Sequence, residues 1–154
     1  MKKYIYALAV LFIMTSLSYG QNSPNKVYVN DMRIVEVSSS PGSAAVYLTI
    51  ANSGEGDARL VGVSSPIVGN AAIHVTKKAA DGKETMEVVD SITVPAGGKV
   101  RLEPGGPHIM LEDIKVPLSD IDGIELFLKF ENARNVIVTV PVKDLENDKN
   151  PFGR

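Results

Sequence analysis

The chain has 154 residues, no cysteine and a formal net charge of −2. Its length suits a single domain that buries a real core, and its slightly acidic balance argues against nucleic acid as a partner. The absence of cysteine excludes structural disulfides, thiolate metal ligands and cysteine nucleophiles. Any soft metal ligand must therefore be a methionine.

The first twenty residues have the order typical of a secretory signal peptide. Lys2 and Lys3 precede an apolar run at residues 4–17, which ends in the sequence Ser-Tyr-Gly at 18–20. A membrane anchor is the alternative, but this run is shorter than the roughly 20 residues that span a bilayer, and no cysteine follows for lipid attachment. We predict a signal peptide at residues 1–20. Its loss would remove two of 16 Lys and Arg and leave 14 against 18 Asp and Glu, a net charge of −4.

From Val27 onwards, short β-branched runs alternate with turn residues, and no segment shows a sustained helical repeat with caps. Period-two alternation predicts two core faces, Val46, Leu48 and Ile50 on one strand and Ile124, Leu126, Leu128 and Phe130 on another. Strands are predicted at residues 33–37, 45–51, 58–63, 72–77, 85–89, 92–94, 99–102, 109–111, 124–130 and 136–142.

This spacing predicts an all-β domain, an immunoglobulin-like two-sheet β-sandwich over residues 21–142. The polar, charged residues 143–154 are expected to form a C-terminal tail outside it.

Histidine and methionine are concentrated in one part of the chain. After residue 20 the sequence contains two histidines and three methionines, and four of these five lie between His74 and Met110. Taken singly, Met86 or Met110 would be interpreted as core packing, and His74 or His108 as a structural strand or loop residue. Their joint spacing favours a shared site, whereas Met32 has no such partner nearby and is assigned to packing.

The spacing is compatible with one ligand. His108 and Met110 are two residues apart, so on a strand both side chains leave the same face. His74 and Met86 flank the turn at Asp81-Gly82, where a two-residue loop would place them on opposite faces. A three-residue loop at 80–82 pairs residue 79 with 83 and 74 with 88, which puts Met86 diagonal to His74 on one face. We predict an odd-numbered loop or a bulge at this turn.

Two imidazoles and two thioethers form a soft, uncharged ligand set that favours Cu(I). Zinc gains little from thioether ligands, and a blue-copper electron carrier needs a cysteine thiolate. Histidine could also serve as a general base for a serine, but no nucleophile motif accompanies His74 or His108. The sequence therefore indicates a metal-binding protein and not an enzyme.

The order His74, Met86 after eleven residues, His108 after twenty-one more and then Met110 resembles that of periplasmic copper chaperones of the PCuAC type. The similarity covers roughly residues 27–140. It includes the segments at 45–52, 60–66, 94–98 and 104–111.

The resemblance implies a cupredoxin-like β-sandwich in the periplasm with one Cu(I) near its surface, delivered to the binuclear copper centre of cytochrome c oxidase. The implied partners are the apo copper subunit of the oxidase and a thioredoxin-like Sco-type protein, with membrane contact only through partners. Val75 departs from the family pattern, in which many members carry a methionine beside the first histidine. We expect copper transfer to begin with displacement of an exposed methionine, taken here as Met110.

Two other functions compete with delivery. The same site could buffer copper and confer resistance without a specific acceptor, although one site per chain favours carriage over storage. The domain could also be an interaction module that binds no metal.

Overall fold

The structure, a computed structural model, describes residues 25–37, 42–80 and 82–142, so the predicted signal peptide and C-terminal tail lie outside the described residues. Within these ranges no helix is both long and apolar enough to cross a membrane. The elements are β1 (Val27–Glu36), β2 (Ala44–Asn52), β3 (Ala58–Ser64), β4 (Val68–Lys78), β5 (Glu84–Val88), β6 (Ile92–Val94), β7 (Lys99–Leu102), β8 (Pro107–Ile114), a 3-10 helix (Leu118–Asp120), β9 (Gly123–Glu131) and β10 (Val136–Pro141).

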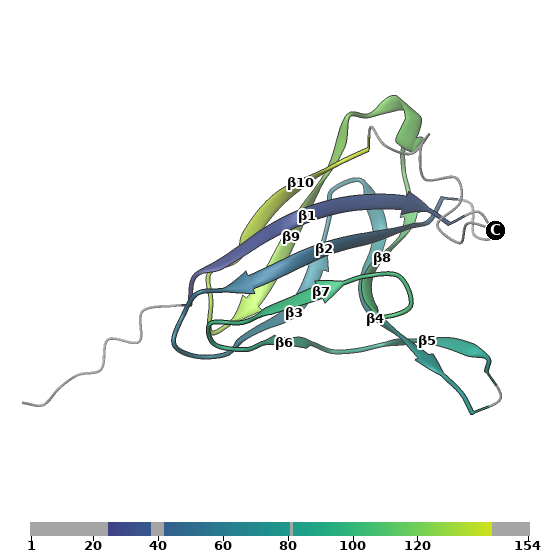
Figure 1. Cartoon of the computed structure of the whole chain (residues 1–154). Coiled ribbons are helices and arrows are strands. Elements are labelled where there is room, and N and C mark those ends of the chain that lie inside the picture. The colour runs from purple at the N-terminus through teal and green to yellow at the C-terminus, as the bar shows by residue number, and fades with distance from the viewer. Residues whose placement is uncertain (1–24, 38–41, 81, 143–154) are drawn as a thin grey trace, which may run out of the picture.

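The strands form two sheets that pack face to face (Figure 1). One sheet has the order β1-β2-β8-β4-β5, with β7 also paired to β2, and the other has the order β10-β9-β3-β6. All pairs between these strands are antiparallel. The prediction of an all-β, two-sheet sandwich is confirmed.

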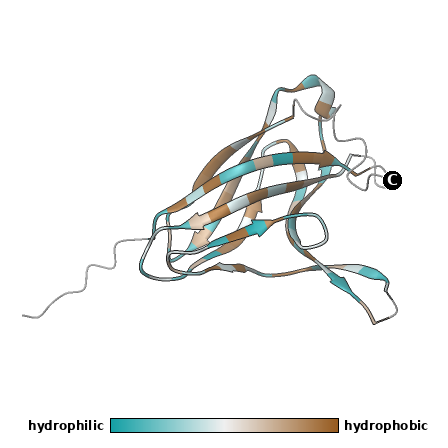
Figure 2. Cartoon of the chain, viewed as in Figure 1, coloured by the Kyte–Doolittle hydropathy of each residue, from teal (hydrophilic) through white to brown (hydrophobic). Residues whose placement is uncertain are grey.

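The core lies between the two sheets. Val46, Leu48 and Ile50 on β2 are buried, as are Ile124, Leu126, Leu128 and Phe130 on β9, which confirms both predicted core faces. Hydrophobic and hydrophilic residues alternate along the strands (Figure 2). Burial of each such aliphatic side chain contributes about 1.5–3 kcal/mol, and packing of this kind holds a chain that has no cysteine.

Two strands extend beyond their predicted bounds for identifiable reasons. β1 begins at Val27, six residues before the predicted start, and a bulge between Asn30 and Arg33 shifts its register. The bulge interrupts the period-two pattern, so the sequence shows clear alternation only after it. β8 begins at Pro107, two residues before its predicted start, because pairing of Val75 with Pro107 continues the ladder past the turn. His108 consequently lies within a strand.

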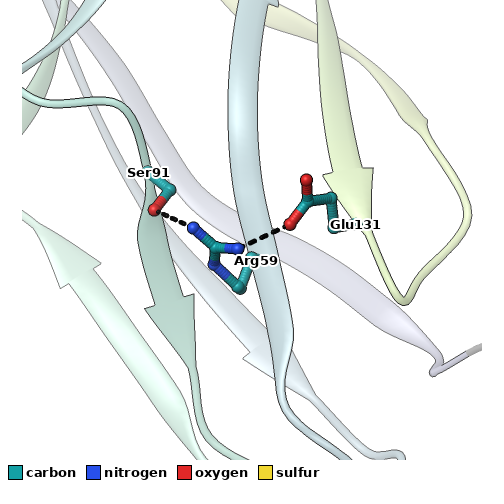
Figure 3. Close-up of polar contacts among 3 residues, drawn as sticks. All are labelled: Arg59, Ser91 and Glu131. Carbon is teal, nitrogen blue, oxygen red and sulfur yellow. Dashed lines mark hydrogen bonds and ion pairs between the residues drawn. The ribbon is translucent and has the colours of Figure 1, made fainter.

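Polar contacts tie the second sheet together on its outer surface (Figure 3). Arg59 on β3 donates from Nη1 to Glu131 Oε2 on β9 at 2.7 Å and from Nη2 to Ser91 Oγ, just before β6, at 2.8 Å. Exposed ion pairs contribute little to stability, and backbone pairing already holds β3 between β6 and β9. These contacts belong to the sheet that does not carry the histidines.

Candidate metal centre

His74 and His108 are directly opposed residues on β4 and β8, and their ring centroids are 5.7 Å apart. Their chain neighbours Ile73 and Ile109 are buried in the core. Because successive side chains of a strand point to opposite faces, both histidines lie on the outer face of the sheet. Met110, paired with Ala72 two residues along the ladder, lies on that same face.

The β4–β5 hairpin brings Met86 to this face. His74 pairs with Val88 and Thr76 pairs with Met86, and the Ala79 N–H donates to the Lys83 carbonyl at 2.8 Å. Gly82 has a φ of 82°, a left-handed conformation that suits glycine. The predicted pairing of 79 with 83 and 74 with 88 is confirmed; Asp81, the middle residue of the loop, lies outside the described residues.

The four candidate ligands differ strongly in exposure. His108 is 3% exposed and Met110 is 9% exposed, His74 is half-buried, and Met86 is 64% exposed. The expectation that Met110 is the exposed methionine is wrong. Met110 lies on an interior strand between Ala45 of β2 and Ala72 of β4, whereas Met86 lies on the edge strand β5.

A backbone contact fixes the orientation of the His108 ring. Its Nδ1 lies 3.0 Å from the carbonyl oxygen of Gly106, in the turn that joins β7 to β8. Because a carbonyl only accepts hydrogen bonds, Nδ1 must carry the proton, which leaves the Nε2 lone pair for a metal. Metal-bound histidines commonly hold their second nitrogen in this way.

His74 is held in its neutral form. Burial lowers the pKa of His74 below its ordinary value, the adjacent His108 lowers it further, and Glu112 opposes the shift. Within the part of the chain that the structure describes, the buried Nδ1 of His74 has no hydrogen-bond partner. A buried polar atom without a partner is costly, and a metal bound there would satisfy it.

The distance between the rings fits a shared metal ion. With metal–nitrogen bonds of about 2.0–2.1 Å, each ring centroid would lie roughly 3.2 Å from the metal, and the two centroids roughly 5–6.4 Å apart for tetrahedral to linear angles. The observed separation falls within this range. Among the described residues, no three or more His, Cys, Asp or Glu side chains are grouped so that they could hold a metal. Met86 and Met110, which lie on the same face of the sheet as the histidines, are the further candidate donors.

One further side chain that the sequence did not single out, Tyr47, lies beside His108. The ring centroid of Tyr47 is 6.2 Å from that of His108, and the Arg33 Cζ lies 5.1 Å from the Tyr47 centroid. Glu112 lies two residues beyond Met110 and accepts a hydrogen bond of 2.8 Å from Asn70. Alternation along β2 could have predicted that Tyr47 points away from the core. Its position next to His108 could not be predicted in this way, because it depends on the pairing of β2 with β8.

A family model described as "Putative lipoprotein LpqE-like" matches residues 27–142, almost the whole of the described sandwich. The chain belongs to the LpqE-like family. This chain is similar to "Putative lipoprotein Lxx21020" of Leifsonia xyli subsp. xyli. The two sequences are 38% identical over 104 residues, which are 67% of this chain. The chain spans less than two thirds of the curated relatives that it matches, 62% and 65% of their lengths.

Solved structures share the fold of this LpqE-like domain. The copper-bound PCuAC domain of PmoF2 is 26% identical with a TM-score of 0.60, and the match covers 77% of this chain and 93% of that one. The Cu(I) form of DR1885 from Deinococcus radiodurans is 25% identical with a TM-score of 0.58, covering 80% and 81%. The resemblance to PCuAC-type proteins and the cupredoxin-like sandwich that it implies are confirmed.

Proposed function

We propose that this LpqE-like protein is an exported copper chaperone that binds one Cu(I) through His74, Met86, His108 and Met110. The observation that carries the proposal is the pair of opposed histidines on the outer face. One buried nitrogen of this pair has no hydrogen-bond partner among the described residues, and a methionine lies diagonal to it. The copper in the PmoF2 domain and the Cu(I) in DR1885 support copper as the cargo.

The ligand set explains the preference for the monovalent ion. Two neutral imidazoles and two thioethers supply no negative charge, and such soft, uncharged ligands suit Cu(I). The depressed pKa of His74 keeps its imidazole neutral at lower pH than that of a free histidine, and only the neutral ring binds metal. Proton competition at this ligand is therefore weakened.

The exposure of the ligands gives an order for release. Met86 is on the projecting hairpin and open to solvent, whereas His108 and Met110 are buried on an interior strand. An incoming donor atom displaces Met86 first while the histidines and Met110 retain the ion. The second and third exchanges then complete the transfer without release of free copper.

The leader sequence and the family resemblance bear on the compartment and the acceptor. The apolar leader at residues 1–20 and the lipoprotein name of a relative support export to the periplasm. The PCuAC resemblance supports delivery to the binuclear copper centre of cytochrome c oxidase, with a Sco-type thioredoxin-like protein as co-worker. It also supports a copper-handling protein and not an enzyme.

Anaerobic titration with Cu(I) against a chromogenic competitor tests the copper site. We expect the chain from Gln21 to bind one equivalent tightly, and the variants His108→Ala and Met86→Ala to bind it at least about 10-fold more weakly. Met32→Leu is the matched control, because Met32 packs partly buried against the core and outside the site. No competition by the wild-type protein, or equal affinity in all variants, would overturn the proposal.

A further inference from the structure

The β4–β5 hairpin carries two of the large apolar side chains that the described surface exposes. Met86 is 64% exposed and Val88 is 66% exposed. The two are separated by one residue on β5, so both point to the face that carries His74, and Val88 is the direct cross-strand partner of His74. Exposed apolar residues gathered next to a site mark interaction surfaces more often than scattered ones do.

The hairpin is placed so that another protein can reach it. β5 is an edge strand of its sheet, and all five of its residues are exposed. Figure 1 shows the hairpin extending beyond the rest of the sandwich. An incoming molecule therefore meets this strand and its apolar pair without having to displace another part of the described chain.

Ion pairs neutralise much of the charge around the apolar pair. On the outer face, Lys78 contacts Glu84 at 3.2 Å, in the cross-strand pair that lies between Met86 and the hairpin turn. On the opposite face, Lys77 contacts Glu87 at 2.5 Å. With its charges paired in this way, the hairpin offers a partner an apolar contact in preference to long-range electrostatic attraction.

We propose that Met86 and Val88 form the surface on which the copper acceptor docks. The acceptor would contact them with apolar side chains that surround its own copper ligands, which are thiolates, thioethers or imidazoles. This inference rests on the proposed function. Direct exchange requires a donor atom of the acceptor to reach the copper while the histidines still hold it. The approach is past Met86, the exposed candidate ligand, and a protein that takes it must cover Val88.

The chemistry of this partner follows from the surface. Its contact is small, as in transient complexes that bury less than about 1,200 Å², so the complex dissociates once the copper has moved. Its affinity comes from apolar burial, so we expect the transfer rate to change little with ionic strength. An acceptor steered by charge would instead slow markedly as salt increases.

Transfer kinetics with Val88→Ser test the docking surface. The Cu(I)-loaded protein is mixed anaerobically with the apo soluble copper domain of cytochrome c oxidase and, separately, with a small chromogenic chelator. We expect Val88→Ser to keep wild-type copper affinity and wild-type release to the chelator, but to transfer about 5- to 10-fold more slowly to the protein, as for loss of a central apolar contact. Ile137→Ser is the matched control, because Ile137 is 60% exposed on β10 of the other sheet.

Each outcome is decisive. Wild-type transfer rates in Val88→Ser, equal slowing in Ile137→Ser, or slowing with the chelator as well would overturn the docking surface and leave the copper site standing. No transfer from the wild-type protein to the oxidase domain would overturn both delivery and docking, whereas failure to bind copper at all would overturn the proposed function itself. Thermal melting of both variants confirms that they are folded.

Discussion

His74 and His108 are directly paired across β4 and β8, and their rings lie 5.7 Å apart on the outer face of the sheet. Both positions are set by main-chain pairing, so the imidazoles are brought together before any metal arrives. Preorganisation of this kind reduces the entropy that binding must overcome. The two candidate methionine ligands lie on either side of this pair, Met110 buried on the interior strand β8 and Met86 exposed on the edge strand β5.

The loop of the β4–β5 hairpin sets the side on which Met86 lies. Deletion of Ala80 shortens the loop by one residue, and a one-residue slip moves each side chain of the strand to the other face. We expect Cu(I) affinity to fall at least about 10-fold, as after Met86→Ala. Insertion of two residues keeps the faces unchanged and is the control. Unaltered affinity in the deletion variant would show that Met86 is not held by this register.

Substitution of Met110 and of Met86 should have different effects on the stability of the apo protein, although both should weaken Cu(I) binding. Met110→Ala removes a buried side chain and should lower the free energy of unfolding of the apo protein by about 2–3 kcal/mol. Met86→Ala removes an exposed one and should change it by less than about 0.5 kcal/mol. Urea denaturation measures both, and Cu(I) titration should show weakened binding in both. A large loss of stability in Met86→Ala would contradict the exposed position of that residue.

Tyr47 should hold the His108 ring in place. Replacement of Tyr47 by Leu removes an aromatic neighbour worth about 0.5–1.5 kcal/mol, so we expect Cu(I) affinity to fall about 2- to 10-fold. Tyr47→Phe keeps the ring and should bind copper like the wild type. Tyr28→Leu, at an exposed tyrosine on β1 of the same sheet, is the matched control. Equal affinities in Tyr47→Leu and Tyr28→Leu would leave Tyr47 without a role in the site.

The pH dependence of apo-protein stability should report the environment of His74. Its pKa is lowered in the folded state by burial and by His108, so below the ordinary value of about 6.5 the unfolded chain binds more protons than the folded one. This contribution to stability is complete above pH 6.5 and is lost as pH falls through the lowered pKa of the folded state. We expect the urea midpoint of the wild type to fall more between pH 7.5 and 5 than that of His74→Gln. Parallel curves for the two proteins would contradict this.

Much of the fold and the face shared by the four candidate ligands could be predicted from the sequence. Alternation identified the core sides of β2 and β9. The requirement that His74 and Met86 share a face predicted an odd-numbered loop with Gly82 in the left-handed conformation, and the observed register agrees. These features depend on residues close together in the chain. The same local reasoning placed His108 and Met110 on one face.

Features that depend on distant pairing could not be predicted in the same way. Met110 is buried because β8 lies between β2 and β4, and Met86 is exposed because β5 is an edge strand. No local pattern distinguishes these two methionines. Tyr47 lies near His108 only because β2 and β8 are neighbours. The bulge at Asp31, which has a φ of 53°, interrupts the alternation, so the first part of β1 was not predicted as a strand.

X-ray absorption spectroscopy of the Cu(I)-loaded protein tests the central claim most directly. A site made by His74, Met86, His108 and Met110 predicts one copper bound by two nitrogen and two sulfur atoms, with one sulfur lost in Met86→Ala and one nitrogen lost in His108→Ala. Copper surrounded only by nitrogen and oxygen, or a spectrum that neither substitution changes, would contradict the account.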